Sequence, residues 1–312
     1  MTSNMTLADY FYEWMETFKK PAVTSVTYIK YENTHAHILA YYGETTLENM
    51  TRQIYQAGLN AFAKNHAKRT TAGFHKHIRC AVLDALEEKL ITTDFTRKAV
   101  ITGTEKQKEK AKFHAYGEWE SLVQHTSENM DNPLNLIIFL SAVTGMRFAE
   151  VLGLTVADID FKAKILRVNK TWDYKYHTGF KPTKNPSSIR NIDLDSRTLK
   201  VLKQVLGSRK MKLPDAKLCV DPQNKLPASA TINRYLSKLC DDLEINRISF
   251  HGIRHTHASV LLFKGVNILS VSKRLGHQDI STTQSVYLHI IKEMEERETK
   301  LITKVMKDAM NF

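Results

Sequence analysis

Residues 251–289 read HGIRHTHASVLLFKGVNILSVSKRLGHQDISTTQSVYLH and place histidines, arginines and a tyrosine within a helical pattern. His251 and Arg254 are three residues apart, so on a helix they share a face, with about 5–6 Å between their Cβ atoms. The glycine before His277 is typical of a helix end, which leaves His277 on the connecting turn. Tyr287 follows ten residues later. This stretch is therefore the first candidate for a functional site.

Two more candidates lie upstream. Arg147 follows a glycine break in Thr-Gly-Met-Arg and stands at the head of a predicted helix. Lys184 lies between two prolines in a region that alternates like β-strands over 164–172 and 188–194. We expect residues 164–194 to form a small antiparallel sheet.

The rest of the chain is predicted to be mainly helical. Apolar residues recur at helical spacing over 7–18, 24–42, 47–64, 70–90, 116–128, 133–144, 147–153, 195–206, 228–243, 251–264, 267–275 and 280–289, with an amphipathic tail over 290–310. The polar residues 101–112 lack this periodicity and are the best linker candidate. The fold expected is a helical bundle over 1–100 and a mainly α domain with a small antiparallel sheet over 113–312.

Composition narrows the class of protein. The 312 residues carry 45 Lys and Arg against 33 Asp and Glu, a net charge of +12, and 42% are hydrophobic. A disordered chain is therefore excluded. The longest apolar run, 134–143, is too short to span a membrane, and the N-terminus does not resemble a signal peptide. Three scattered cysteines cannot form a disulfide framework or a four-cysteine zinc site, which favours the cytoplasm.

The positive charge is concentrated. Between Lys162 and Arg190 there are eight basic residues and one acid, Asp173. Such a stretch suits a polyanion such as nucleic acid, although a solvated basic loop explains the charge equally well.

Familiar nucleotide and metal motifs are absent. The sequence contains neither G-x-x-x-x-G-K-[ST] nor H-E-x-x-H. The nearest approach to a metal site is His251, His255 and His257, but Gly252 stands where a zinc protease needs its glutamate. We therefore expect no metal and no cofactor.

Taken together, the candidate residues resemble the tyrosine recombinase (phage integrase) family. The matching elements are Arg147 in TGMRFAEVLGL, Lys184, the H-x-x-R at 251–254, the LGH at 275–277 and Tyr287 in TTQSVYLH. The resemblance covers about residues 113–292, and the helical first hundred residues look like the core-site DNA-binding (SAM-like) domain of that family. The resemblance implies that the chain is a site-specific DNA recombinase, the integrase of a mobile element.

The resemblance also implies roles for the residues. Tyr287 is the nucleophile that forms a 3′-phosphotyrosyl link, Arg147 and Arg254 bind the scissile phosphate, and His251 and His277 assist it. Lys184 is the general acid, although Lys175 and Lys181 lie on the same hairpin. The chemistry agrees, because guanidinium groups stabilise the oxygens of a phosphoryl transition state without metal ions.

Partners and alternatives follow from the same resemblance. The partners implied are double-stranded recombination sites, a homotetramer on paired sites and an excisionase or DNA-bending accessory protein, with the protein associated with the nucleoid and with no membrane. The DNA-binding candidates in the first domain are Lys68, Arg69, Lys76 and Arg79, for which a solvated face is the competing interpretation. An arm-site-binding domain of the family is not seen, so it is either naturally absent or truncated.

Three other functions remain open. A chromosome-dimer or plasmid-resolving recombinase shares the chemistry, and a type IB topoisomerase fits the H-x-x-R and LGH pattern less well. A catalytically silent DNA-binding protein is the alternative from a different class, although such a protein has no reason to keep Tyr287.

Overall fold

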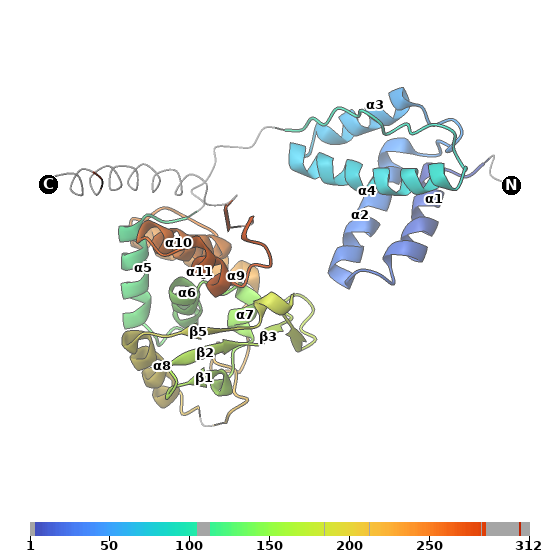
Figure 1. Ribbon diagram of the computed structural model, residues 1–312. Coiled ribbons are helices and arrows are strands. Elements are labelled where there is room, and N and C mark those ends of the chain that lie inside the picture. Colours follow the sequence, from blue (N-terminus) through green and yellow to red (C-terminus); the bar gives the residue numbers. More distant parts are fainter. Residues whose placement is uncertain are drawn as a thin grey trace. The chain divides into compact units, whose positions relative to one another are not determined.

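The computed structural model describes residues 4–104, 113–183, 185–211, 213–281, 283–284 and 306. Lys184, Tyr287, linker residues 105–112 and, apart from residue 306, the tail 290–310 lie outside these described residues. Contacts within the chain separate two compact units, Met1–Lys108 and Glu109–Phe312 (Figure 1).

The first unit is a bundle of helices, as the periodicity predicted. Its helices within residues 4–104 are α1 (Leu7–Trp14), α2 (Ser25–Tyr42), α3 (Arg52–Ala63) and α4 (Lys68–Glu87), and a π-helical segment, Met15–Lys19, continues α1. Thr6 and Asp9 form a capping box that satisfies free backbone N–H groups where α1 begins. Large side chains fill the centre, among them Phe11, Trp14, Ile38, Tyr55, Leu59, Phe62 and Ile78.

The helix predicted over 47–64 begins later than its periodicity indicated. The backbone N–H of Leu47 donates to the carbonyl of Met5 at 2.9 Å, and Thr46 pairs with Thr6 in a β-bridge. Because this pairing with the N-terminal segment holds residues 46–47 outside the helix, the helix begins only after Thr51. The Thr51 hydroxyl caps it by accepting from the N–H of Ile54 at 3.2 Å.

The second unit is mainly α-helical with two small antiparallel sheets, which confirms the predicted fold class. Its helices among the described residues are α5 (Tyr116–Glu128), α6 (Pro133–Thr144), α7 (Phe148–Leu152), α8 (Ser196–Ser208), α9 (Ser229–Asp242), α10 (Phe250–Phe263) and α11 (Ile268–Leu275). The strands are β1 (Ile159–Asp160), β2 (Ile165–Val168), β3 (Lys170–Trp172), β4 (Phe180–Pro182) and β5 (Arg190–Asp193). Across the described parts of both units, every helix is too short or too polar to cross a membrane.

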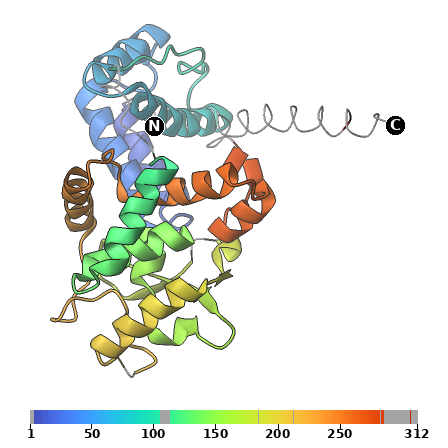
Figure 2. The ribbon, with the colours of Figure 1, turned by 90° about the vertical axis from the view of Figure 1, so that its left-hand side faces the viewer.

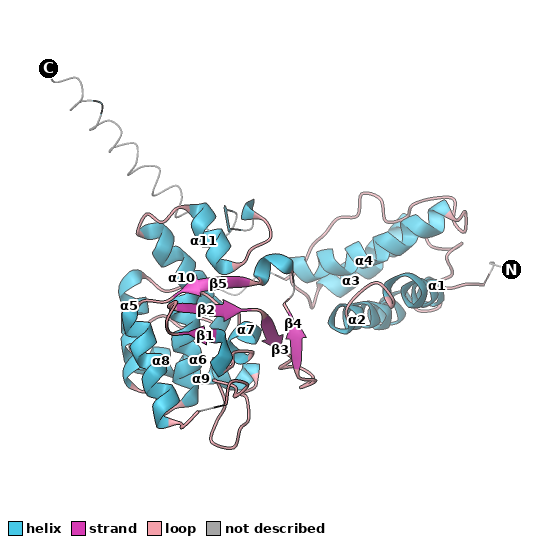
Figure 3. Cartoon of the chain, turned by 60° about the horizontal axis from the view of Figure 1, so that its bottom comes forward, coloured by secondary structure: helices cyan, strands magenta, loops and turns pink. Residues whose placement is uncertain are grey.

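The prediction of a single sheet over 164–194 was wrong, because the strands of this region belong to two separate sheets (Figure 3). β2 lies between β1 and β5, with Leu166 opposite Ile192, whereas β3 pairs only with β4. Leu166 and Val168 are buried in the core, but β3 is half-exposed. The strand predicted over 164–172 therefore breaks at residue 169, where the chain leaves the core and enters the β3–β4 hairpin.

Helix α6 forms the centre of the second unit. It is apolar on nearly all sides, and its residues are buried from Asn135 to Ala142, as expected for a helix surrounded by protein. α5 and α10 pack against it, and Figure 2 shows α5 lying along one side. The helix ends at Gly145, whose φ of +70° favours glycine. The central helix therefore ends two residues before Arg147, which is the first of the candidate site residues along the chain.

Candidate active site

Arg147 is fixed at the N-terminus of α7 by a buried carboxylate. Its Nη1 donates to Oε1 of Glu150 at 2.7 Å, and its backbone N–H donates to Oε2 at 2.9 Å. The Glu150 side chain is only 2% exposed, whereas that of Arg147 is 32% exposed. One edge of the guanidinium is therefore held by the protein while the side chain still reaches solvent.

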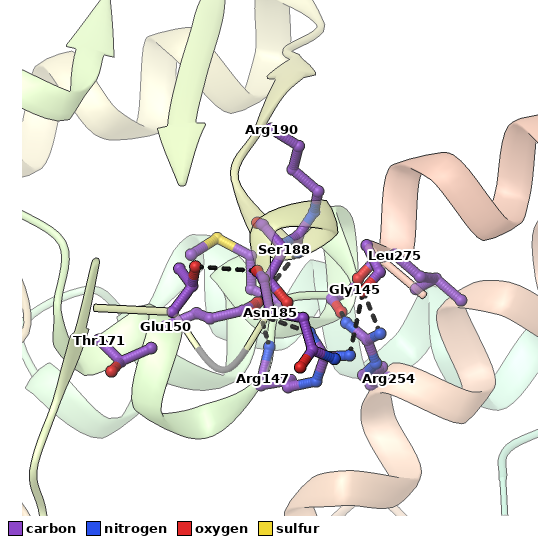
Figure 4. A network of polar contacts seen from close by, with 12 residues as sticks. Gly145, Arg147, Glu150, Thr171, Asn185, Ser188, Arg190, Arg254 and Leu275 are labelled. Atoms are coloured by element: carbon purple, nitrogen blue, oxygen red, sulfur yellow. Dashed lines mark hydrogen bonds and ion pairs between the residues drawn. The ribbon is translucent and has the colours of Figure 1, made fainter. Parts of the chain in front are cut away.

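Glu150 also binds a second guanidinium, that of Arg190 at the start of β5. Arg190 Nη2 donates to Oε2 of Glu150 at 3.0 Å (Figure 4). Burial on its own would raise the pKa of Glu150, but Arg190 and Arg147 outweigh burial and hold the pKa below its usual range. Glu150 is therefore ionised at neutral pH.

Helix α10 carries His251 and Arg254. The Ser249 hydroxyl caps this helix by accepting from the N–H of Gly252 at 3.2 Å. The Arg254 side chain is buried, and it donates from Nη1 to the carbonyl of Gly145 at 2.6 Å and from Nη2 to that of Leu275 at 2.8 Å. These two bonds join α10 to the end of α6 and to the end of α11 (Figure 4).

His277 lies on the turn after α11, as its glycine predicted. Gly276 ends the helix with a φ of +69°, and its carbonyl accepts from Arg147 Nη2 at 3.3 Å. The ring Nδ1 of His277 lies 2.7 Å from the hydroxyl of Thr283, which is fully buried. Burial and then the charges of Arg254 and Arg147 lower the pKa of His277 to about 4, so its ring is neutral at pH 7.

The imidazole of His251 shares this environment. Partial removal from water lowers its pKa, and Arg254 and Arg147 lower it further. Two arginines and two neutral imidazoles therefore belong to one group, drawn from the start of α7, from α10 and from the turn after α11. Such a group can bind an anionic oxygen through charge-assisted and neutral hydrogen bonds.

The three clustered histidines do not converge on one metal site. His257 is buried, its Nδ1 donates to the carbonyl of Ala142 at 2.9 Å, and its Nε2 accepts from Arg274 Nε at 3.1 Å. Burial and the charge of Arg274 lower the pKa of His257 to about 3. His251 packs edge-to-face on His255 instead. His257 thus serves as a structural link between α10, α6 and α11.

The two remaining candidates, Lys184 and Tyr287, lie outside the described residues. Of the alternatives to Lys184, Lys181 binds Asp173 at 2.6 Å. This hydrogen bond does most to hold the pKa of Asp173 below its usual range. Lys175 lies in the exposed turn of the same hairpin. The assignment of the general acid to Lys184 stays a prediction.

Sequence reasoning missed Glu150, Arg190 and Thr283. Glu150 had a signal, because an acidic residue three positions after a helix N-cap is the capping-box spacing, which the Arg147 backbone and Glu150 satisfy. Arg190 had none, because Glu150 and Arg274 lie 40 and 84 residues away, and Thr283 had none, because its contact with His277 depends on the path of the chain after α11.

The DNA-binding candidates of the first unit share one stripe of α4. At about 100° per residue, Lys68, Arg69, Lys76 and Arg79 fall within roughly 100° of helix circumference. The first three are exposed, but Arg79 donates from Nη1 to Asp94 at 2.8 Å and to the Thr96 hydroxyl at 2.7 Å. Arg79 therefore holds the segment after α4 in place.

Replacing Gly276 with alanine is expected to destabilise the second unit and to displace His277. A Cβ at this position would lie 3.0 Å from Arg190 Nη1 and 3.1 Å from the Ser187 carbonyl, and its positive φ already disfavours alanine. We expect a loss of about 1–2 kcal/mol in the free energy of unfolding. Chemical denaturation measures it, with Gly207→Ala as control, because Gly207 lies within α8 with open space around it. An equally stable Gly276→Ala variant would contradict this interpretation.

The amino-acid sequence of this chain is similar to those of known proteins. The profile of the Phage integrase family matches residues 115–294, and that of the Phage integrase N-terminal SAM-like domain matches residues 6–63. The integrase of a Staphylococcus phage is 30% identical over an alignment of 266 positions that covers 78% of this chain and 75% of that protein. A XerC-like tyrosine recombinase of Caldanaerobacter subterraneus subsp. tengcongensis is 25% identical over an alignment of 315 positions that covers 92% of this chain and 80% of that protein.

A solved structure extends the similarity to the fold. The Tn1549 transposon integrase, in complex with transposon right end DNA, has a TM-score of 0.74 at 18% identity, covering 94% of this chain and 99% of that chain. At this identity the similarity shows a shared fold.

Proposed function

The chain belongs to the phage integrase family, and from this premise we propose that it cuts and rejoins double-stranded DNA at specific recombination sites. The observation that carries the proposal is the group formed by Arg147, His251, Arg254 and His277. Segments far apart in the sequence bring these residues together, and Arg254 ties two of those segments by direct hydrogen bonds.

The proposed reaction needs no net energy input. The Tyr287 hydroxyl gives its proton to the neutral imidazole of His251 or His277 as its oxygen attacks the phosphorus, so a tyrosyl O–P bond forms and the bond from phosphorus to the 5′ oxygen breaks. Lys184 gives its proton to the leaving 5′ oxygen, while Arg147 and Arg254 stabilise the charge that builds up on the non-bridging oxygens. A 5′ hydroxyl of the second duplex reverses the step, so phosphodiester bonds are conserved.

The neutral rings of His251 and His277 suit this reaction. A neutral imidazole both donates and accepts a hydrogen bond, so it can contact the phosphate and also pass a proton. A bound phosphate would offset part of the effect of the arginine charges and raise the pKa of both rings toward the usual range.

The biological role we propose is integration and excision of a mobile element by a tetramer on paired sites, with an excisionase or DNA-bending protein as accessory partner. The similarity to a phage integrase over three quarters of each chain favours this role over chromosome-dimer or plasmid resolution. The first unit would bind the core site.

A nicked suicide substrate tests the proposal. Cleavage releases a short fragment that carries the 5′ hydroxyl, and this fragment diffuses away. The covalent protein–DNA adduct then cannot be resealed, and it survives denaturant. We expect this adduct with DNA of the parent element. Binding without any adduct would identify the protein as catalytically silent instead.

Lys76 and Arg79 are expected to behave differently although they share the α4 stripe. Neutralising exposed Lys76 with glutamine should weaken DNA binding and reduce the slope of log affinity against log salt by about 0.9. Arg79→Met should chiefly lower the free energy of unfolding of the first unit, by about 1 kcal/mol, because it breaks the contacts with Asp94 and Thr96. Binding titrations at several salt concentrations and thermal melts separate the two effects. An unchanged salt slope in Lys76→Gln would show that α4 does not face the phosphates.

A further inference from the structure

Arg190 is a nearly buried arginine, and each of its three guanidinium nitrogens donates a hydrogen bond within the second unit. Its side chain is 6% exposed, and it lies at the first position of β5. Nε donates to the carbonyl of Arg274 at 2.6 Å, Nη1 to that of Ser188 at 2.9 Å, and Nη2 to Glu150 at 3.0 Å. Two backbone carbonyls therefore fix the guanidinium, and its third contact is the carboxylate that holds Arg147.

The surroundings of Arg190 leave it little freedom. Arg274 also binds β5, because its Nη1 donates to the carbonyl of Asp193 at the end of that strand at 3.3 Å. The backbone of Gly276 also packs closely on Arg190, as a Cβ there would come within 3.0 Å of Nη1. Hydrogen bonds in both directions thus join β5 to the end of α11. The guanidinium of Arg190 is held in one orientation, with Nη2 directed at Glu150.

The two arginines on Glu150 have a consequence for the site. Oε1 of Glu150 accepts from Arg147 at 2.7 Å and Oε2 accepts from Arg190 at 3.0 Å, so each carboxylate oxygen has its own guanidinium partner. Without Arg190, Oε2 would keep only the backbone N–H of Arg147. The buried carboxylate would then be held less firmly, and Arg147 would lose the fixed partner that orients its guanidinium.

We propose that Arg190 is a positioning residue of the cleavage reaction, which acts through Glu150 to orient Arg147. The inference depends on the proposed function, since it concerns the rate of that reaction. Arg190 itself contacts no DNA in this proposal. Its effect reaches the phosphate only through the Glu150–Arg147 pair.

The first test compares Arg190→Met with Arg209→Met on the suicide substrate, at saturating protein and with rates normalised to the folded fraction. Arg209 is a matched control, because it also donates to backbone carbonyls, those of Leu218 and Met130, but contacts none of the site residues that the structure describes. Adduct formation by Arg190→Met should be about 10- to 100-fold slower than wild type, the usual cost of misplacing a reacting group. Arg209→Met should react at the wild-type rate. Equal rates for both variants, whether wild-type or slowed, would overturn the proposal.

The second test is a double-mutant cycle with Glu150→Gln. If Arg190 acts through Glu150, adding Arg190→Met to Glu150→Gln should slow the reaction by less than about twofold. Multiplying effects would show that Arg190 works by another route. Arg190→Lys serves if the methionine variant does not fold, because one ammonium nitrogen cannot reproduce the three separate nitrogens with which the guanidinium donates. It should be slow in wild-type background and nearly neutral in Glu150→Gln.

The pH dependence provides a signature that loss of stability would not produce. Glu150 faces Arg147 at the N-cap of its own helix and Arg190 on β5. Of these two arginines, Arg190 lowers the pKa of Glu150 more. In Arg190→Met, burial should raise the pKa of Glu150, so Glu150 would protonate and release Arg147 as the pH falls. The rate should therefore decline at a higher pH than in wild type, and Glu150→Gln should remove this difference. Identical profiles for wild type and Arg190→Met would contradict the proposal.

A wild-type protein that forms no adduct would instead count against the proposed function. The two failures are therefore distinguishable, because only the inference about Arg190 is overturned when wild type and Arg190→Met react equally.

Discussion

Tyr287→Phe is expected to abolish formation of the covalent adduct while leaving DNA binding within about twofold of wild type. Phenylalanine keeps the aromatic ring but lacks the oxygen that attacks phosphorus, and no other group in the proposed mechanism can form the same bond. The suicide-substrate assay gives the adduct yield, and a gel-shift titration gives the affinity.

Tyr235 and Tyr174 are the tyrosines to compare. The Tyr235 hydroxyl donates to Asn135 at 2.8 Å, burial raises its pKa, and Tyr174 packs edge-to-face on Phe148. Both have packing roles, so Tyr235→Phe and Tyr174→Phe should still form the adduct. An adduct formed by Tyr287→Phe but lost in either of these variants would identify a different nucleophile.

Arg254→Lys is expected to slow adduct formation by about 10²- to 10³-fold, the typical cost of removing a donor that stabilises a charged transition state. The Arg254 guanidinium reaches the carbonyls of Gly145 and Leu275 at the same time, at 2.6 and 2.8 Å. An ammonium group presents a single nitrogen and cannot reproduce this planar fork. DNA affinity should change much less than the rate, because most of it comes from phosphate contacts elsewhere.

Arg247→Lys is the matched control for this change. Arg247 precedes α10 and pairs with Asp241 on the exposed surface, so the same substitution should leave the rate unchanged. Single-turnover rates on the suicide substrate compare the two variants. A rate for Arg254→Lys close to that of wild type would show that Arg254 has only a structural role.

Much of the fold follows from local patterns. Periodicity predicted α5 and α6 with the bounds that the structure shows, because the start of α6 is set by the Asn132 cap and Pro133 and its end by Gly145. The shared face of His251 and Arg254 and the turn position of His277 are equally local. Helical geometry and a glycine stop determine them before any tertiary contact forms.

The predicted roles of the site residues came from the order of five sequence elements, and they stay predictions. The elements specify which side chains the family uses at each position, whereas the structure shows how four of them are held. The zinc interpretation illustrates the difference. Spacing alone allowed His251, His255 and His257 to be grouped, but both ring nitrogens of His257 bind protein groups.

The sequence by itself determined where most of the helices form, the glycines that end α6 and α11, and the residues available for chemistry. The tertiary structure alone decided that residues 164–172 divide between two sheets, that Arg254 binds the carbonyl of Gly145, 109 residues away, and that Arg190 reaches Glu150, 40 residues away. The physical reason is that every residue carries a backbone carbonyl, so an arginine that binds carbonyls leaves no matching signature at its partner's position. Which carbonyls it meets depends on how helices and strands distant in the sequence pack together.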